Sequence, residues 1–363
     1  MKTGKMESLI RVAVIGVSGW GQYHLLAIQE LEKRKICKLV AIATRTKENA
    51  AKFSKIYNVP AYTDYLQLFS KEELDAVTIA TPDHLHRDIV LSALDNKLHV
   101  FVEKPLDLTI EGCKKIAQKA DEAGVILHVD FHKRYDPYVK SLRELIKNDA
   151  FGNIEYVYAY MEDRIDIPQK MHWAASTDPY WFLGVHKIDA LRWMLDQEVV
   201  EVFAKAHKKV LVSHGIDTFD SISFLAEFTR GTVGFVNVGW ILPSCFEAPV
   251  NQGFRIVGTQ GLAEVDTQDR GFKIWNEGRM QTLNLFTLHK VTEGGDEVPR
   301  GYYIDSVFDF IYNVYLVKTG AKAVEELKDK YPNERDGLYA TQVGVAVHQS
   351  ILTGRPIKIS EVV

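Results

Sequence analysis

The sequence predicts an α/β protein built from two domains. Its first third alternates short apolar segments with amphipathic helical segments, whereas strands follow one another closely between residues 199 and 275. The chain has 363 residues, more than one hydrophobic core usually holds. We therefore expect a doubly wound parallel sheet in residues 1–130 and an α+β domain in residues 131–363.

The first domain is predicted from its alternation of strands and helices. Apolar runs predict strands at residues 10–15, 39–44, 76–80, 98–102 and 125–131. Amphipathic patterns predict helices at residues 23–34, 47–57, 86–96 and 110–123. Such alternation implies right-handed βαβ units, and near-continuous apolar strands are expected where helices cover both faces of a parallel sheet. This is the pattern of a Rossmann domain.

The second domain begins with mixed elements and continues as a series of strands. Helices are predicted at 137–147 and 186–195, with a strand at 154–161 between them. Further strands are predicted at residues 199–208, 221–228, 232–240, 254–257, 263–265 and 273–275. Short links containing Gly231 and Gly261 indicate hairpins, so we expect a large, open, mostly antiparallel sheet. Two helices close the chain, at 302–318 and 333–352.

Composition excludes several classes of function. The net charge of -4 gives no reason to expect nucleic acid or an acidic membrane surface as a partner. No apolar run approaches the ~20 residues that span a bilayer. Cys37, Cys113 and Cys245 are odd in number and far apart, and residues 1–8 lack the apolar core of a signal peptide, so we expect a cytoplasmic protein. The open sheet face suggests a homodimer or homotetramer.

A glycine-rich turn links the first strand to the first helix. Such a turn holds a dinucleotide diphosphate when its backbone comes close and its N–H groups point outward. Gly16 and Gly21 occupy the first and third glycine positions of this motif, and Ser18 occupies the second, followed by Gly19 and Trp20. We expect these five residues to bind the cofactor, although glycines also occur in such turns for turning alone.

The end of the second strand indicates which dinucleotide binds. An acid there usually holds the ribose 2′-hydroxyl of NAD, but this chain has Thr44 and Arg45. A basic side chain beside a hydroxyl suits a 2′-phosphate, which favours NADP over NAD. The alternative is that Arg45 is a solvated loop residue.

Lys104 follows the fourth strand, where parallel sheets bind ligands. Its amine could hydrogen-bond the oxygen of a substrate alcohol or ketone and help to move a proton while the cofactor moves hydride. Pro105 restricts Lys104 to an extended backbone and permits a cis bond. The competing interpretation is a surface lysine at a strand end.

With these motifs in place, the chain resembles the Gfo/Idh/MocA oxidoreductases, which include glucose–fructose oxidoreductase and inositol dehydrogenases. The matching segments run in order over nearly the whole chain, at residues 14–24, 80–86, 102–106, 131–137, 184–189 and 350–356.

The resemblance implies roles for individual residues. Lys104 would orient the reacting hydroxyl, and His186 would be the general base in oxidation and the acid in reduction. Substrates would be sugars, cyclitols or their keto forms. The cofactor would also be lined by Thr81, Pro82, His86, Glu103 and Lys104. For the substrate wall we expect, besides His186, the residues Tyr135, Trp173, Asp178 and Trp181.

One position departs from the family pattern. Many members carry an aspartate four residues before the catalytic histidine, where this chain has Phe182. Asp178 or a group from elsewhere could replace that carboxylate. Trp181 and Phe182 could instead stack on the apolar face of a sugar.

Two other functions remain open at this point. His128, Asp130 and His132 alternate along a strand, so they could face one side and bind the metal of a hydrolase. We nevertheless expect that the protein binds no metal. The absent carboxylate at Phe182 also leaves open a sensor that binds dinucleotide without turnover.

Overall fold

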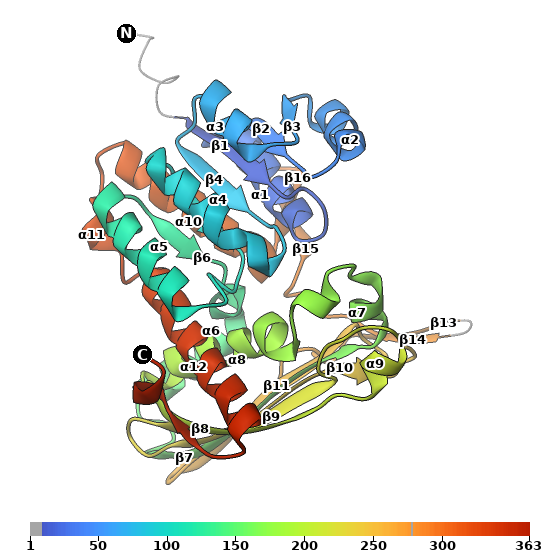
Figure 1. The fold of residues 1–363 in the computed structure, drawn as a ribbon. Coiled ribbons are helices and arrows are strands. Elements are labelled where there is room, and N and C mark those ends of the chain that lie inside the picture. Colours follow the sequence, from blue (N-terminus) through green and yellow to red (C-terminus); the bar gives the residue numbers. More distant parts are fainter. Residues whose placement is uncertain (1–8, 277–278) are drawn as a thin grey trace. The chain divides into compact units, whose positions relative to one another are not determined.

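The computed structural model describes residues 9–276 and 279–363, and the chain divides into two compact units. The first unit runs to His132 and resumes over Thr287–Leu338 (Figure 1). The second comprises Lys133–Phe286 and Tyr339–Val363. One unit is built on a parallel sheet and the other on a mostly antiparallel sheet, so the predicted fold class is confirmed.

The first unit contains a six-stranded parallel sheet in the order β3–β2–β1–β4–β5–β6. Its strands are β1 (Ile10–Ile15), β2 (Cys37–Ala43), β3 (Ala61–Tyr62), β4 (Ala76–Ile79), β5 (His99–Val102) and β6 (Leu127–Val129). The order reverses between β1 and β4, and ligands of such sheets bind at the carboxyl ends of the strands beside this reversal. The sequence analysis missed β3 and made the last strand too long.

Helices connect the parallel strands. They are α1 (Gly21–Lys33), α2 (Lys47–Tyr57), α3 (Tyr65–Lys71), η1 (Asp83–Leu85), α4 (His86–Asp95) and α5 (Ile110–Ala123). Side chains of Thr46, Asp64 and Thr109 cap the first turns of α2, α3 and α5, whereas no side chain caps α1. Right-handed crossovers place α1 and α2 on one face of the sheet and α4 and α5 on the other.

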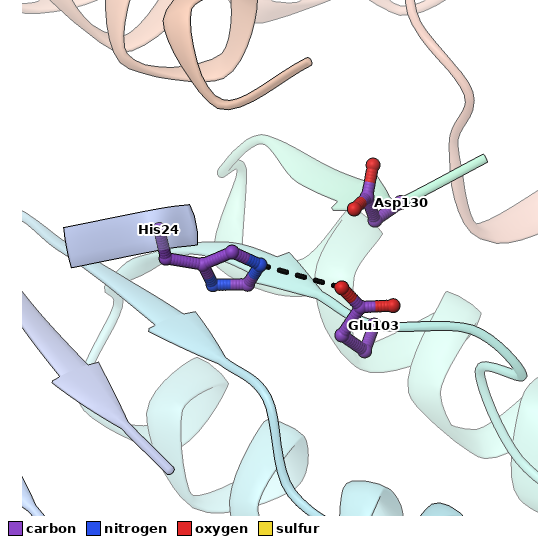
Figure 2. Close-up of side chains that lie close together, drawn as sticks. All are labelled: His24, Glu103 and Asp130. Atoms are coloured by element: carbon purple, nitrogen blue, oxygen red, sulfur yellow. Dashed lines mark ion pairs between the residues drawn. The ribbon is translucent and has the colours of Figure 1, made fainter. Parts of the chain in front are cut away.

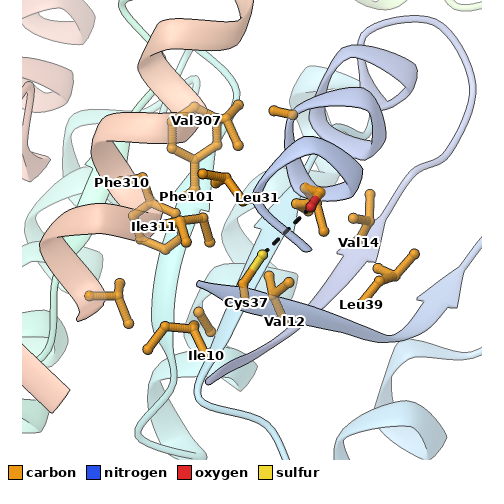
Figure 3. Packing of buried hydrophobic residues seen from close by; sticks show 14 of the residues in the cluster. Ile10, Val12, Val14, Leu31, Cys37, Leu39, Phe101, Val307, Phe310 and Ile311 are labelled. Carbon is orange, nitrogen blue, oxygen red and sulfur yellow. Dashed lines mark hydrogen bonds between the residues drawn. The ribbon is translucent and has the colours of Figure 1, made fainter. Parts of the chain in front are cut away.

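The core of the first unit includes a helix from late in the chain. Residues 287–338 form a hairpin of β15 (His289–Glu293) and β16 (Asp296–Arg300), then α10 (Tyr302–Lys318) and α11 (Val324–Leu327). Val307, Phe310 and Ile311 of α10 share one buried cluster with Val12 of β1 and Leu31 of α1 (Figure 3). Residues 287–338, assigned from sequence to the C-terminal domain, thus complete this unit's core; the boundary at residue 130 stays a prediction.

The second unit contains a seven-stranded sheet in the order β12–β11–β7–β10–β9–β8–β17, antiparallel except where β7 pairs with β10. Its strands are β7 (Ile154–Arg164), β8 (Val199–His207), β9 (Ser221–Phe228), β10 (Val233–Leu242), β11 (Val250–Gly258), β12 (Gly261–Asp266) and β17 (Ile357–Lys358). The strand expected at 273–275 does not join this sheet. It forms a separate hairpin of β13 (Lys273–Asn276) and β14 (Arg279–Thr282).

The second unit also contains helical segments, one of which carries the candidate base His186. They are η2 (His132–Tyr135, which begins in the first unit), α6 (Pro137–Lys147), α7 (Asp166–Lys170), η3 (Ala174–Ser176), the π-helical turn η4 (Tyr180–Gly184), α8 (Val185–Leu195), α9 (Val210–Ser213), α12 (Glu334–Thr353, which begins in the first unit) and η5 (Ile359–Glu361). Among the described residues, no helix has the length and apolar character needed to cross a membrane.

Candidate active site

The glycine turn after β1 is closely packed. Gly16 has a φ of +86°, and a Cβ there would lie 2.2 Å from the Ala80 carbonyl oxygen beyond β4. A Cβ on Gly21 would lie 1.8 Å from the Gly16 carbonyl oxygen. Ser18 and Gly19 are exposed, and Gly19 also has a positive φ, of +59°. The turn therefore requires glycine at positions 16 and 21, where a side chain would collide with backbone. Ser18 and Gly19 at the tip of the turn remain accessible to a diphosphate.

Trp20, the next residue in the turn, is part of an aromatic group. Its ring stacks on His132 with centroids 5.2 Å apart and meets Tyr303 of α10 edge-on. This packing holds the start of α1.

The expected ribose-binding position lies directly after β2. Thr44 is buried and donates its backbone N–H to the Tyr62 carbonyl oxygen at 2.9 Å, whereas Arg45 is exposed. An exposed arginine beside the sheet edge could face either a hydroxyl or a phosphate.

His86 ties two loops together at the carboxyl edge of the sheet. Its ring is buried, with Nδ1 2.6 Å from the Pro105 carbonyl oxygen and Nε2 2.9 Å from the Thr81 carbonyl oxygen. Thr81 and Pro82 themselves are half-buried. Because both ring nitrogens point at protein carbonyls, His86 contributes by positioning Thr81 and Pro105.

Lys104 lies at the end of β5, and only 5% of it is exposed. The bond between Lys104 and Pro105 is cis, an option that the sequence analysis left open. Glu103, directly before it, is buried as well. The expected surface-lysine alternative is therefore wrong, because a lysine at a solvated strand end would be largely exposed.

Glu103 meets two other ionisable side chains at this edge (Figure 2). His24 Nε2 lies 3.4 Å from Glu103 Oε1, and Asp130 follows β6 next to them. Burial raises the pKa of Asp130 to about 6, while His24, Ser306, Glu103 and Lys104 act in the opposite direction. The sequence analysis assigned no role to His24.

The three residues suggested as metal ligands do not form one group. His128 stacks on Tyr331 with ring centroids 5.3 Å apart, and His132 stacks on Trp20. Asp130 and His132 do approach each other, with Asp130 Oδ2 3.5 Å from His132 Nδ1. In the described part of the chain, the group with metal-like spacing is instead His24, Glu103 and Asp130.

In the second unit, His186 lies in the first turn of α8 and is buried. The π-helical turn η4 leads directly into this helix. Gly184 at its end is packed so closely on Tyr180 that a Cβ would lie 2.8 Å from the ring, and the Tyr180 hydroxyl donates to the Ala340 carbonyl oxygen at 2.8 Å. The position of His186 thus depends on how η4 is held.

Asp178 holds η4 in place. Its Oδ1 accepts the backbone N–H groups of Tyr180 and Trp181, at 2.8 and 3.3 Å, and its Oδ2 lies 2.6 Å from His348 Nε2. The His348 ring also stacks on Trp181. Burial opposes the charged form of His348, but the hydrogen bond and charge of Asp178 outweigh it and raise the pKa of the imidazole. Asp178 and Trp181 therefore support the turn, and both are largely buried.

Other predicted substrate residues are more accessible. Tyr135, Trp173 and Phe182 are half-buried, and the Phe182 ring lies between those of Trp173 and Trp240, at 6.1 and 5.5 Å. Asp178 does not replace the carboxylate that is absent at Phe182, because it is engaged with η4 and His348.

Buried charges around His186 were not predicted. Arg134 Nε donates to Asp189 Oδ2 at 2.8 Å, and Arg270 pairs with Asp136. Burial lowers the pKa of Lys133 to about 8. The sequence analysis found no indication of these pairs, because charge pairing between separate elements leaves no local signal.

Two family models match the chain. One, described as an oxidoreductase family with an NAD-binding Rossmann fold, covers residues 10–131. The other, the GFO/IDH/MocA C-terminal domain, covers residues 139–264. The chain belongs to the Gfo/Idh/MocA oxidoreductase family. Membership confirms the predicted enzyme class, a nicotinamide-dependent dehydrogenase, whereas the preference for NADP is not supported.

Known members of the Gfo/Idh/MocA family resemble the chain over almost its full length. The scyllo-inositol 2-dehydrogenase (NAD(+)) of Bacillus subtilis is 24% identical over 98% of this chain and 97% of its own. The myo-inositol 2-dehydrogenase of Thermotoga maritima is 24% identical over 96% and 99%. The crystal structure of scyllo-inositol dehydrogenase from Lactobacillus casei with NAD(H) and scyllo-inositol has a TM-score of 0.75 at 19% identity, covering 97% and 99% of the two chains.

Proposed function

We propose that this protein is an NAD-dependent dehydrogenase that oxidises a ring hydroxyl of a cyclitol or sugar to a ketone. The observation that carries the proposal is that Lys104 is buried at the carboxyl edge of the parallel sheet. At the same edge, the turn between β1 and α1 is tightly packed and requires Gly16 and Gly21. A dinucleotide bound along that edge brings its reactive ring to the ends of the strands.

The cofactor would be held mainly by backbone groups. The N–H groups of Ser18, Gly19 and Trp20 suit the diphosphate, because they lie just before the uncapped helix α1. Gly16 and Gly21 shape the turn, and their N–H groups donate to the carbonyl oxygens of Ala43 and Ser18. Thr44 and Arg45 would face the adenosine ribose, and Thr81, Pro82 and Glu103 would line the nicotinamide end. NAD is preferred because the matching family is described as NAD-binding.

The chemistry divides between two side chains. The Lys104 ammonium donates a hydrogen bond to the oxygen of the reacting hydroxyl and stabilises the charge that grows there. His186 accepts the hydroxyl proton in oxidation and returns it in reduction. The hydrogen on the carbon that bears this hydroxyl leaves as hydride. A bound nicotinamide would supply the capacity to accept it.

Substrate contacts are assigned to the accessible aromatic residues Tyr135, Trp173 and Phe182. Aromatic faces stack on the apolar face of a ring that carries hydroxyls at its rim. Asp178 and Trp181 act behind them by holding η4. The names of the relatives support a cyclitol or sugar.

The test is a turnover assay with NAD and NADP against a panel of cyclitols and sugars, read by the absorbance of reduced nicotinamide. We expect reduction of NAD with at least one ring alcohol and weaker binding of NADP. Arg45→Ala should lower affinity for NADP more than for NAD. Tight NAD binding without turnover on any substrate would favour the sensor.

We further propose that two copies associate through the open face of the antiparallel sheet. Tyr158 of β7, Phe235 of β10 and Leu225 of β9 are exposed and directly opposite one another in register. We also propose a cytoplasmic location, because the odd number and wide spacing of Cys37, Cys113 and Cys245 are not those of a disulfide framework.

A further inference from the structure

Three ionisable side chains from separate elements converge at the carboxyl edge of the parallel sheet. His24 comes from the first turns of α1, Glu103 follows β5, and Asp130 follows β6 (Figure 2). All three are buried, and their ligand atoms lie within 4.8 Å of one another. We name them the buried triad.

The charges of the buried triad must be balanced together with Lys104. Two ionised carboxylates and one ammonium would leave one uncompensated charge in a buried site, which is costly. Adding one proton to the three side chains leaves a single negative charge opposite the Lys104 ammonium. Carboxyl oxygens of Glu103 and Asp130 lie within 4.8 Å of each other, a distance at which two negative charges repel unless a proton is bound.

We propose that His24, Glu103 and Asp130 share a single proton, and that the one negative charge left on them positions the Lys104 ammonium for catalysis. This inference rests on the proposed role of Lys104 in turnover. His24 and Asp130 are positioning residues, since they act on the substrate through Lys104, and Glu103 has this role besides lining the nicotinamide end.

Groups from four different elements interact with Asp130. They are His24 of α1, Glu103 and Lys104 at the end of β5, His132 of η2 and Ser306 of α10. A second proton, added at acid pH, would remove the charge opposite Lys104. The raised pKa of Asp130, about 6, brings this change close to neutral pH.

A divalent cation is the other occupant that the triad's spacing would suit. The Lys104 ammonium beside Asp130 opposes it, because a divalent cation there would lie near a second positive charge. A proton balances the site with Lys104 charged, whereas a divalent ion would leave it positive.

The first test needs no turnover. In the full-length protein labelled with carbon-13 at aspartate carboxyl groups, one resonance should titrate near pH 6 and disappear in Asp130→Asn. Ser306→Ala should raise the midpoint of this titration, because Ser306 favours the ionised form of Asp130. If Asp130→Asn does not fold, the shift in Ser306→Ala assigns the resonance to Asp130. If every aspartate titrates in the ordinary range near ~4, the proposal is wrong.

The second test is a double-mutant cycle on kcat/KM. Asp130→Asn and Glu103→Gln each leave one carboxylate opposite Lys104, so each should lose less than about tenfold, and Asp130→Asn should lose the acid limb of the pH profile. The double variant removes the charge entirely and should lose at least about a hundredfold more than the product of the single losses.

Controls separate this charge effect from folding and cofactor binding. Thr78→Val changes a buried polar side chain on the neighbouring strand β4 and should leave the pH profile unchanged. The Kd for NAD is measured for each variant to separate binding from turnover. Additive losses, or stoichiometric metal in the purified protein, would overturn the proposal. If the unmodified enzyme shows no turnover, the proposed function is wrong. The buried triad is then tested by the carboxyl titration alone.

Discussion

Lys187, directly after His186, is a fully buried amine. Its Nζ lies 3.9 Å from the centre of the Phe254 ring. Burial lowers the pKa of Lys187 well below its usual value, and the nearby Lys133 lowers it further. In the unfolded chain the same amine is solvated and protonated at neutral pH, so the unfolded state binds more protons there.

We predict that Lys187→Met raises the free energy of unfolding at neutral pH by about 1–3 kcal/mol, because burial opposes the protonated form of the amine and methionine carries no such proton. The gain should shrink as pH rises toward the usual lysine pKa of about 10.4, where the unfolded chain loses the proton too. Denaturant unfolding at several pH values measures it.

The matched control is Lys147→Met, an exposed lysine in α6, which should change stability by no more than about 0.5 kcal/mol. A loss of stability in Lys187→Met at all pH values would mean that the amine makes a net favourable contact, and would contradict this account of its burial.

Residues with local roles were predictable, and residues with distant partners were not. Gly16 and Gly21 were found because a tight strand-to-helix turn restricts residue type over a few positions. Asp178 was expected to contact substrate, whereas its Oδ2 is bound to His348, 170 positions away in sequence. Nothing in the sequence around Asp178 indicates that histidine.

At the scale of elements, the Asp178–His348 pair connects α12 to η4 and therefore to the start of α8. Since the folded pKa of His348 is raised above 6.5, its stabilising effect is fully present below that value and is lost as pH rises through the folded pKa. His348 by itself should thus contribute less stability at about pH 9 than at about pH 6.

We predict that His348→Gln costs about 2 kcal/mol of unfolding free energy at about pH 6 and less at about pH 9, because the charge-assisted hydrogen bond to Asp178 is lost. The variant should also reduce kcat, since η4 leads into the helix that carries His186. His207→Gln, an exposed histidine on β8, serves as control. An equal cost at both pH values would contradict a charged His348.

Long periodic elements were predicted more successfully than short ones. The predicted bounds of α6, β9 and α10 agree with the structure, because each is a long segment with clear periodicity. The two-residue strand β3 was missed, since so short a segment has no detectable alternation. The last parallel strand was predicted too long, because its apolar run continues past Val129 into the loop that carries Asp130.

At the scale of the whole molecule, the exposed apolar row on the antiparallel sheet bears on assembly. Tyr158 and Phe235 stack with ring centroids 4.7 Å apart, and Leu225 lies opposite Phe235 on the next strand. An exposed apolar group of this kind on a soluble protein commonly marks an interface.

We predict that Phe235→Glu shifts the protein toward monomer, as measured by light scattering during size-exclusion chromatography, because it places a charge within the apolar row. Leu352→Glu, at an exposed apolar position on α12, should leave the mass unchanged. An unmodified protein that is monomeric, or a Phe235→Glu variant of unaltered mass, would show that this face is not the interface.

The division of the chain was only partly predictable. The change from alternating strands and helices to consecutive strands marks the end of the first sheet near residue 130. That residues 287–338 return to the first unit was not visible in sequence, because the apolar face of α10 fits any core of suitable shape. The packing of Phe310 near Phe101 is a tertiary contact with no local signal.

The central claim is that Lys104 acts on the substrate oxygen while the cofactor is held elsewhere, and single-turnover hydride transfer in Lys104→Ala tests it most directly. We predict a rate at least about a hundredfold below that of the unmodified enzyme, with the Kd for NAD changed less than about threefold. Lys115→Ala, an exposed lysine on α5, should behave as the unmodified enzyme. A near-normal rate in Lys104→Ala would contradict the account.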